Sequence, residues 1–93
     1  MIGNTLSEFI DSLYMNCDKE IAFHGSKIMV EGWLNPENST YTLRAYKCSE
    51  GYPELFSETD SDRSVCVAAF EKAKIFDGKT VYEASDDIEV LYD

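Results

Sequence analysis

The sequence lacks the features that direct a protein to a membrane or out of the cell. No stretch approaches the roughly 20 consecutive apolar residues that a transmembrane helix needs. Its first residues do not show the basic and then apolar pattern of a secretory signal. The three cysteines, Cys17, Cys48 and Cys66, are odd in number and far apart, whereas small secreted domains usually carry an even and dense set. These absences predict a cytoplasmic protein.

Residue types that support catalysis or bind metals are also scarce. His24 is the single histidine, and it stands beside Gly25 in an expected turn. None of the cysteines has a partner at the short spacing that structural zinc requires. The five glycines do not form a Gly-rich loop that would hold a nucleotide phosphate. We therefore expect no catalytic residue, no metal and no cofactor.

Basic residues are few, with 8 Lys and Arg against 18 Asp and Glu, so the net charge is −10. The charge is uneven, because residues 1–49 carry six acids and four bases whereas residues 50–93 carry twelve acids and four bases. Such a charge repels nucleic acid and anionic membranes and speeds encounter with cationic surfaces. It predicts a basic protein partner, which includes nucleic-acid-binding proteins, and no direct contact with nucleic acid or membrane. Many proteins, however, are acidic only because charge keeps them soluble.

The chain is short, and its 93 residues make one domain that spans residues 1–93. Hydrophobic residues make up 44% of the sequence and aromatic residues 13%, which is enough to fill a small core.

Local patterns predict the elements of the first half. Thr5 and Glu8 fit a capping box, and an apolar stripe at helical spacing follows them, so we expect a helix over 5–16. Alternation around Ile21, a turn at Gly25-Ser26 and an apolar run over 27–34 predict a hairpin.

Beyond a cluster of turn residues, alternation predicts a strand over 41–48 and a shorter extended piece over 54–58. Thr59 or Asp60 can cap a helix over 61–74. A second capping-box pattern starts a last helix at 81. Its end is ambiguous, because residues 86–93 match both strand and helix spacing, and we favour a helix there.

Together these elements predict an α+β fold with an N-terminal helix, an antiparallel sheet of three or four strands and two C-terminal helices on one face of the sheet. The expected core residues are Leu6, Phe9, Ile10, Leu13, Ile21, Phe23, Ile28, Val30, Leu43, Phe56, Cys66, Phe70, Val81 and Ile88.

The acidic residues of the second half are the candidate binding site. Carboxylates two residues apart on a strand lie about 6.6 Å from each other on one side, so acids at 54, 58, 60 and 62 would form a row if the chain stays extended. Such a row would imitate the phosphates that a DNA-binding groove receives. The expected partner-binding acids are Glu54, Glu58, Asp60, Asp62, Glu83, Asp86, Asp87, Glu89 and Asp93.

Two stretches carry a resemblance to known proteins. The sequences YPELFSE at 52–58 and VCVAAF at 65–70, with the predicted order of helix, strands and two helices, resemble in topology the small phage anti-CRISPR proteins whose acidic faces occupy the DNA-binding site of Cas9. The stretch IFDGKTVYEA at 75–84 is similar to the ends of small acidic proteins of bacterial mobile elements. The first resemblance implies an inhibitor of a nucleic-acid-handling protein, and the second implies no particular activity.

Three classes of function remain open. An acidic binding module that inhibits or regulates a basic partner would gather the acids of 54–62 and 83–93 on one face. A self-associating or subunit-like protein would expose an apolar patch around Trp33 or Tyr46 and a free sheet edge. An enzyme would hold His24 or two carboxylates in a deep pocket. We expect the first class and no enzymatic activity.

Overall fold

A computed structural model describes residues 1–92 and shows an α+β fold built on one antiparallel sheet of five strands. The strand order is β4-β3-β2-β1-β5, so that β4 and β5 form the two edges. In chain order the elements are α1 (Leu6–Ser12), β1 (Cys17–Phe23), β2 (Ser26–Asn35), β3 (Thr40–Lys47), β4 (Glu54–Asp60), α2 (Arg63–Lys72), α3 (Val81–Ala84), the 3₁₀ turn η1 (Ser85–Asp87) and β5 (Ile88–Tyr92).

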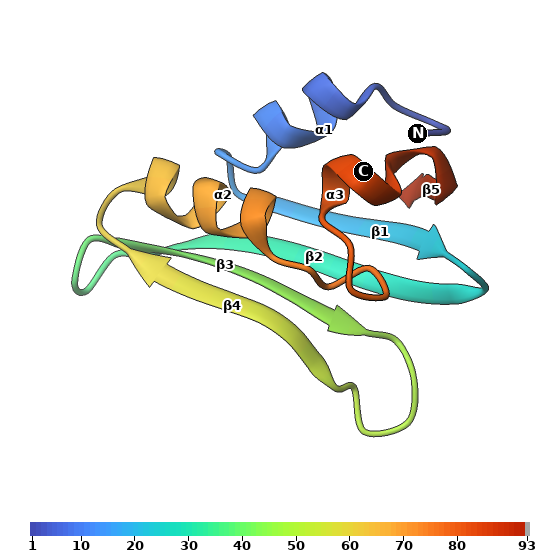
Figure 1. The fold of residues 1–93 in the computed structure, drawn as a ribbon. Helices are drawn as coiled ribbons and strands as arrows, with labels where there is room; N and C mark the ends of the chain where they lie inside the picture. Colours follow the sequence, from blue (N-terminus) through green and yellow to red (C-terminus); the bar gives the residue numbers. More distant parts are fainter. Residues whose placement is uncertain (93) are drawn as a thin grey trace.

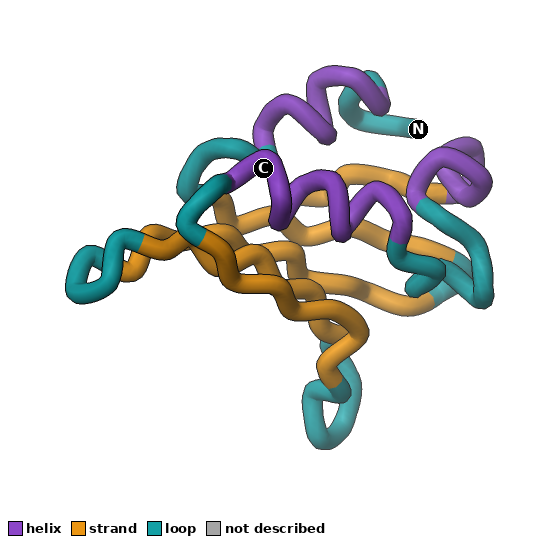
Figure 2. Tube along the Cα trace, turned by 60° about the vertical axis from the view of Figure 1, so that its left-hand side comes forward, coloured by secondary structure: helices purple, strands orange, loops and turns teal. Residues whose placement is uncertain are grey.

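The molecule has two layers. The helices α1, α2 and α3 all lie over the same face of the sheet, and no described element lies over the other face (Figures 1 and 2). The loop between β3 and β4 projects away from the helices, on the uncovered side (Figure 1). The predicted fold class is confirmed, with an N-terminal helix, an antiparallel sheet and C-terminal helices, but the sheet has five strands rather than three or four.

Side-chain caps start the helices. The Thr5 hydroxyl accepts the backbone N–H of Glu8 at the start of α1, and Thr80 and Glu83 form a complete capping box at the start of α3, as the sequence predicts. The helix α2 begins later than expected, because residues up to Asp60 still belong to β4, and its N-cap is Asp62 rather than Thr59 or Asp60.

Two tight turns carry backbone angles that favour small or polar residues. The β1–β2 hairpin turns at His24 and Gly25, with φ of 47° and 79°, which is the pattern of a type I′ turn. The expected turn at Gly25-Ser26 is therefore displaced by one residue. A second turn of the same kind, at Asp77 and Gly78, links α2 to α3 and brings Asp77 to His24.

The C-terminal segment differs from the expected helix. After one turn of α3 and the 3₁₀ turn η1, the chain becomes the strand β5, which pairs with β1 and places Ile88 opposite Phe23. Pairing buries Ile88 completely, while the alternate residue Glu89 stays exposed. A helix over 86–92 would have placed several acids at its own negative end, so the strand also removes an unfavourable dipole interaction.

The core lies between the sheet and the helices. Twelve of the fourteen expected core residues are buried, and the other two, Leu6 and Phe56, are partly buried and pack against the core. The core also holds residues that the sequence patterns did not single out: Tyr41, Ala45, Val67, Phe76 and Ala84.

Tyr41 is the largest of these added core residues. Its hydroxyl lies 2.7 Å from the carbonyl oxygen of Leu13 and 2.8 Å from that of Met15, so it ties β3 to the end of α1. Gly32 on β2 leaves the space that the Tyr41 ring occupies.

Candidate partner-binding surface

The uncovered face of the sheet, which we call the open face, is defined by the strand register. Directly paired residues in an antiparallel sheet point to the same side. Glu31 pairs with Asp18 on one side and Arg44 on the other, and Met29 pairs with Glu20 and Tyr46. These side chains alternate with buried ones such as Val30, so they point away from the helices.

An apolar centre lies on the open face. Met29 and Tyr46 are directly paired, and Trp33, which is 37% exposed, lies on the far side of the Glu31–Arg44 pair. Tyr52 from the β3–β4 loop packs edge-on against Tyr46, with ring centroids 6.2 Å apart. The two residues expected as an apolar interface, Trp33 and Tyr46, therefore lie on the same face.

Carboxylates surround this centre: Asp18, Glu20, Glu31, Glu54 and Glu89. The basic residues of the same face are Lys27, which lies 3.4 Å from Glu20, and Arg44, whose Nε lies 3.4 Å from Glu54.

The other three carboxylates of the open face, those of Asp18, Glu31 and Glu89, have no ion-pair partner among residues 1–92. Burial and the nearby Glu31 raise the pKa of Tyr46. The open face thus combines aromatic surface with an excess of negative charge.

The four acids expected as one row on residues 54–62 do not share one side. The register of β3 and β4 shifts between Ala45 and Tyr46, so that Glu54 lies opposite Tyr46 on the open face whereas Glu58 lies opposite Leu43 on the helix side. A β-bulge of this kind reverses the side to which the following residues point.

The last two acids of that expected row lie at the end of β4. Asp60 lies opposite Tyr41 and accepts the backbone N–H of Asp62. The carboxylate of Asp62 caps α2, and hydrogen bonds from the Ser64 hydroxyl and backbone N–H lower its pKa.

The acids expected at residues 83–93 lie apart from those of β4. They belong to α3, η1 and β5, and β5 is the opposite edge of the sheet from β4. Glu83 caps α3, and its hydrogen bond with the backbone N–H of Thr80 lowers its pKa. Asp86 is exposed on η1, Asp87 contacts His24, and Glu89 lies on the open face. Asp93 lies outside the described residues.

His24 is held by two carboxylates from the other end of the chain. Its Nδ1 lies 3.0 Å from Asp77 Oδ2 and its Nε2 lies 3.0 Å from Asp87 Oδ2. Hydrogen bonds to Asp87 and Asp77 raise the pKa of His24, because the charged imidazolium donates from both nitrogens. Both ring nitrogens already face carboxylate oxygens, so this geometry suits a clamp between hairpin and helical layer better than a general base.

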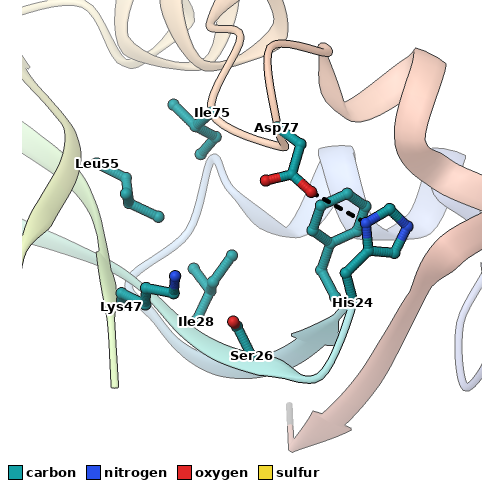
Figure 3. A pocket seen from close by; sticks show the side chains of 8 residues that line it. His24, Ser26, Ile28, Lys47, Leu55, Ile75 and Asp77 are labelled. Carbon is teal, nitrogen blue, oxygen red and sulfur yellow. Dashed lines mark hydrogen bonds and ion pairs between the residues drawn. The ribbon is translucent and has the colours of Figure 1, made fainter. Parts of the chain in front are cut away.

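A small cavity lies beside this clamp (Figure 3). Its volume is about 140 Å³, well below the several hundred Å³ of typical ligand pockets. Leu55, Ile75 and Ile28 contribute apolar side chains to its lining, and Lys47 and Ser26 contribute polar ones (Figure 3). The carboxylate of Asp77 faces this space but is already engaged by His24.

Two of the cysteines, Cys17 and Cys66, have thiols whose pKa is raised. Burial raises the pKa of the Cys66 thiol, which is enclosed between α2 and the sheet, and burial likewise raises that of Cys17. A raised pKa keeps a thiol protonated and weakens it as a nucleophile.

Several open-face residues escaped the sequence patterns: Asp18, Glu20, Met29, Glu31 and Tyr52. The signal that would have found them is the alternation along β2, where Lys27, Met29, Glu31 and Trp33 occupy every second position. These residues are recognisable as one surface only once the pairing with β1 and β3 is known.

Comparison with known proteins returned no match to a family model, a curated protein or a solved structure. Among the described residues, no helix has the length and apolar character needed to cross a membrane.

Proposed function

We propose that this chain is a non-enzymatic binding module that holds a basic protein partner on the open face of its sheet. The observation that carries this proposal is that half-exposed Trp33 and partly buried Tyr46 share the open face with three carboxylates that form no ion pair in the described chain. Aromatic residues supply contact area at protein interfaces. Complementary charge supplies partner choice and fast association.

A nucleic-acid-binding protein is the partner class that fits best. Proteins that bind DNA present basic surfaces to phosphates, and a face that offers fixed carboxylates competes for the same surface. The net charge of −10 adds a long-range attraction to such a partner. The resemblance in topology to anti-CRISPR proteins implies the same class of partner.

Self-association through the open face is the competing function, and charge disfavours it. Two copies stacked by this face would bring Asp18, Glu31 and Glu89 of each copy against those of the other. Like charges pressed together at an interface cost free energy that the aromatic contacts would have to offset. A partner with a basic surface would not bring this repulsion.

The test compares two variants of equal net charge. The open-face variant carries Asp18→Asn, Glu31→Gln and Glu89→Gln, whereas the control carries Asp11→Asn, Glu37→Gln and Asp86→Asn at exposed sites elsewhere. Partners captured from host-cell lysate are identified by mass spectrometry, purified and titrated against both variants at low and moderate salt.

We expect an identified basic protein whose affinity falls with salt and falls by about tenfold or more for the open-face variant alone. Competition by duplex DNA would identify the nucleic-acid-binding class. Equal binding by both variants, or an affinity that ignores salt, would overturn the proposal.

A further inference from the structure

The two edges of the sheet differ in a way that bears on partner binding. At the β5 edge, Ile2 forms a parallel bridge with Glu89, with its N–H donating to Ile88 O at 3.0 Å and its carbonyl accepting from Val90 N at 2.8 Å. The outward groups of β5 are therefore satisfied at that point. No described segment pairs with the outer edge of β4, which is seven residues long (Figure 1).

We propose that the β4 edge accepts an extended, basic segment of the partner as a sixth strand of the sheet. An unpaired edge offers a row of backbone N–H and C=O groups, and strand addition to such an edge is a common mode of peptide recognition. This inference rests on the proposed function, since it describes how part of the same basic partner is held.

The negative charge of β4 favours a basic segment as the added strand. Glu58 and Asp60 point to the helix side of the strand and Glu54 to the open-face side, so carboxylates accompany an added strand on both of its faces. Strands lie about 4.8 Å apart, which brings basic side chains of an added strand into contact with these acids.

A second copy of this chain is disfavoured as the occupant by the same residues. Pairing of β4 with another β4 would place Glu58 and Asp60 of one copy next to acids of the other, and like charges across a strand pair are destabilising. The acids thus block self-pairing and leave the edge open to a basic strand.

The position of β4 allows one partner to pair with the sheet edge and to contact the open face at the same time. Every second residue of an added strand would lie beside Ser57 and Thr59, which pair with Arg44 and Thr42 on the open-face side. The added strand would therefore extend the open face outward, and a partner could continue from the edge onto its aromatic centre.

The test uses defined peptides in place of the partner. The first probe is a blocked peptide of the length of β4 with lysine and valine in alternation, and the second is the same peptide with N-methyl groups on alternate backbone nitrogens. Both are titrated up to about 1 mM, a range that detects weak binding. Amide chemical shifts and hydrogen exchange of the protein report where each peptide binds.

We expect the first peptide to shift and protect amide protons of β4, and the N-methylated peptide to bind about tenfold more weakly or worse, as the loss of a backbone hydrogen bond implies. The variant Glu58→Gln/Asp60→Asn should weaken binding, whereas Asp11→Asn/Asp86→Asn should not. Asp60→Asn keeps a side-chain oxygen that can accept the Asp62 N–H.

Two results would overturn strand addition. Shifts centred on Met29 and Tyr46, with β4 amides unprotected and both peptides bound equally, would place the basic segment on the open face and leave the proposed function standing. No binding of either peptide would reject the edge site. The titration of the open-face variant against the purified partner then decides the proposed function separately.

Discussion

Asp18 and Glu31 lie directly opposite each other on the open face, in the central pair of strands β1 and β2. Their Cβ atoms are about 5 Å apart by sheet geometry, and like charges in such a pair are destabilising. Because Glu31 also lies opposite Arg44, the position where a neutral residue should stabilise the sheet is Asp18. Under the proposed function, a basic partner would neutralise this pair.

The variant Asp18→Asn separates stability from binding. We expect it to raise the free energy of unfolding by about 0.2–1 kcal/mol, because it removes the repulsion without changing side-chain shape. It should also weaken partner binding. Urea denaturation at low salt measures the first effect, and Asp11→Asn on α1 is the control that should change neither quantity. A loss of stability in Asp18→Asn would show that the carboxylate serves the fold.

The His24 clamp predicts a pH-dependent stability. The pKa of His24 is raised in the folded state by Asp87 and Asp77, so its contribution is fully present below the unfolded value of about 6.5 and is lost as pH rises through the higher folded value. The variant His24→Asn keeps a residue that tolerates the positive φ of this turn. We expect the wild-type protein to exceed it in stability at low pH, with the difference shrinking as pH rises.

Urea denaturation from about pH 5 to about pH 9 measures this difference, and the ring-proton shifts of His24 give its pKa directly. The variant Asp77→Asn/Asp87→Asn should bring that pKa back toward the ordinary value. A stability difference that does not change with pH would contradict the clamp.

Local signals in the sequence predicted the parts of the fold that depend on local interactions. The caps at Thr5 and Thr80 are contacts between residues three apart, and the structure confirms both. The helix α2 and the strands β2 and β3 follow from periodicity. Periodicity could not predict β5, because residues 86–92 match the spacing of a helix as well as that of a strand. The strand forms by pairing with β1, which is a contact distant in sequence.

The candidate site was less predictable, since it depends on register. The bulge near Leu55 places Glu54 and Glu58 on opposite faces, although their spacing alone puts them on one. The contact between His24 and Asp87 joins residues 63 positions apart. Trp33 and Tyr46 were recognised by their chemistry, whereas Asp18 and Glu31 become a feature only when the strands are paired.

The capping box of α3 predicts that substitution of Thr80 lowers the stability of the protein. Replacing Thr80 by Ala removes the oxygen that accepts the Glu83 N–H, and should cost about 1 kcal/mol in the free energy of unfolding. Thr80→Ser keeps that oxygen and should cost much less. Urea denaturation measures both, and equal losses would assign the effect to the methyl group instead.

A Cβ atom on Gly32 would overlap the buried hydroxyl of Tyr41, so these two residues predict a coupled effect. Gly32→Ala should destabilise the protein by about 1–3 kcal/mol, the usual cost of overpacking a core. Tyr41→Phe alone should cost about 1–3 kcal/mol, because the carbonyl of Leu13 loses its buried donor. In the double variant Gly32→Ala/Tyr41→Phe, the missing hydroxyl relieves part of the overlap. The double variant should therefore lose less stability than the sum of the losses in the two single variants. Strict additivity would show that the backbone of β2 absorbs the extra methyl group without involving Tyr41.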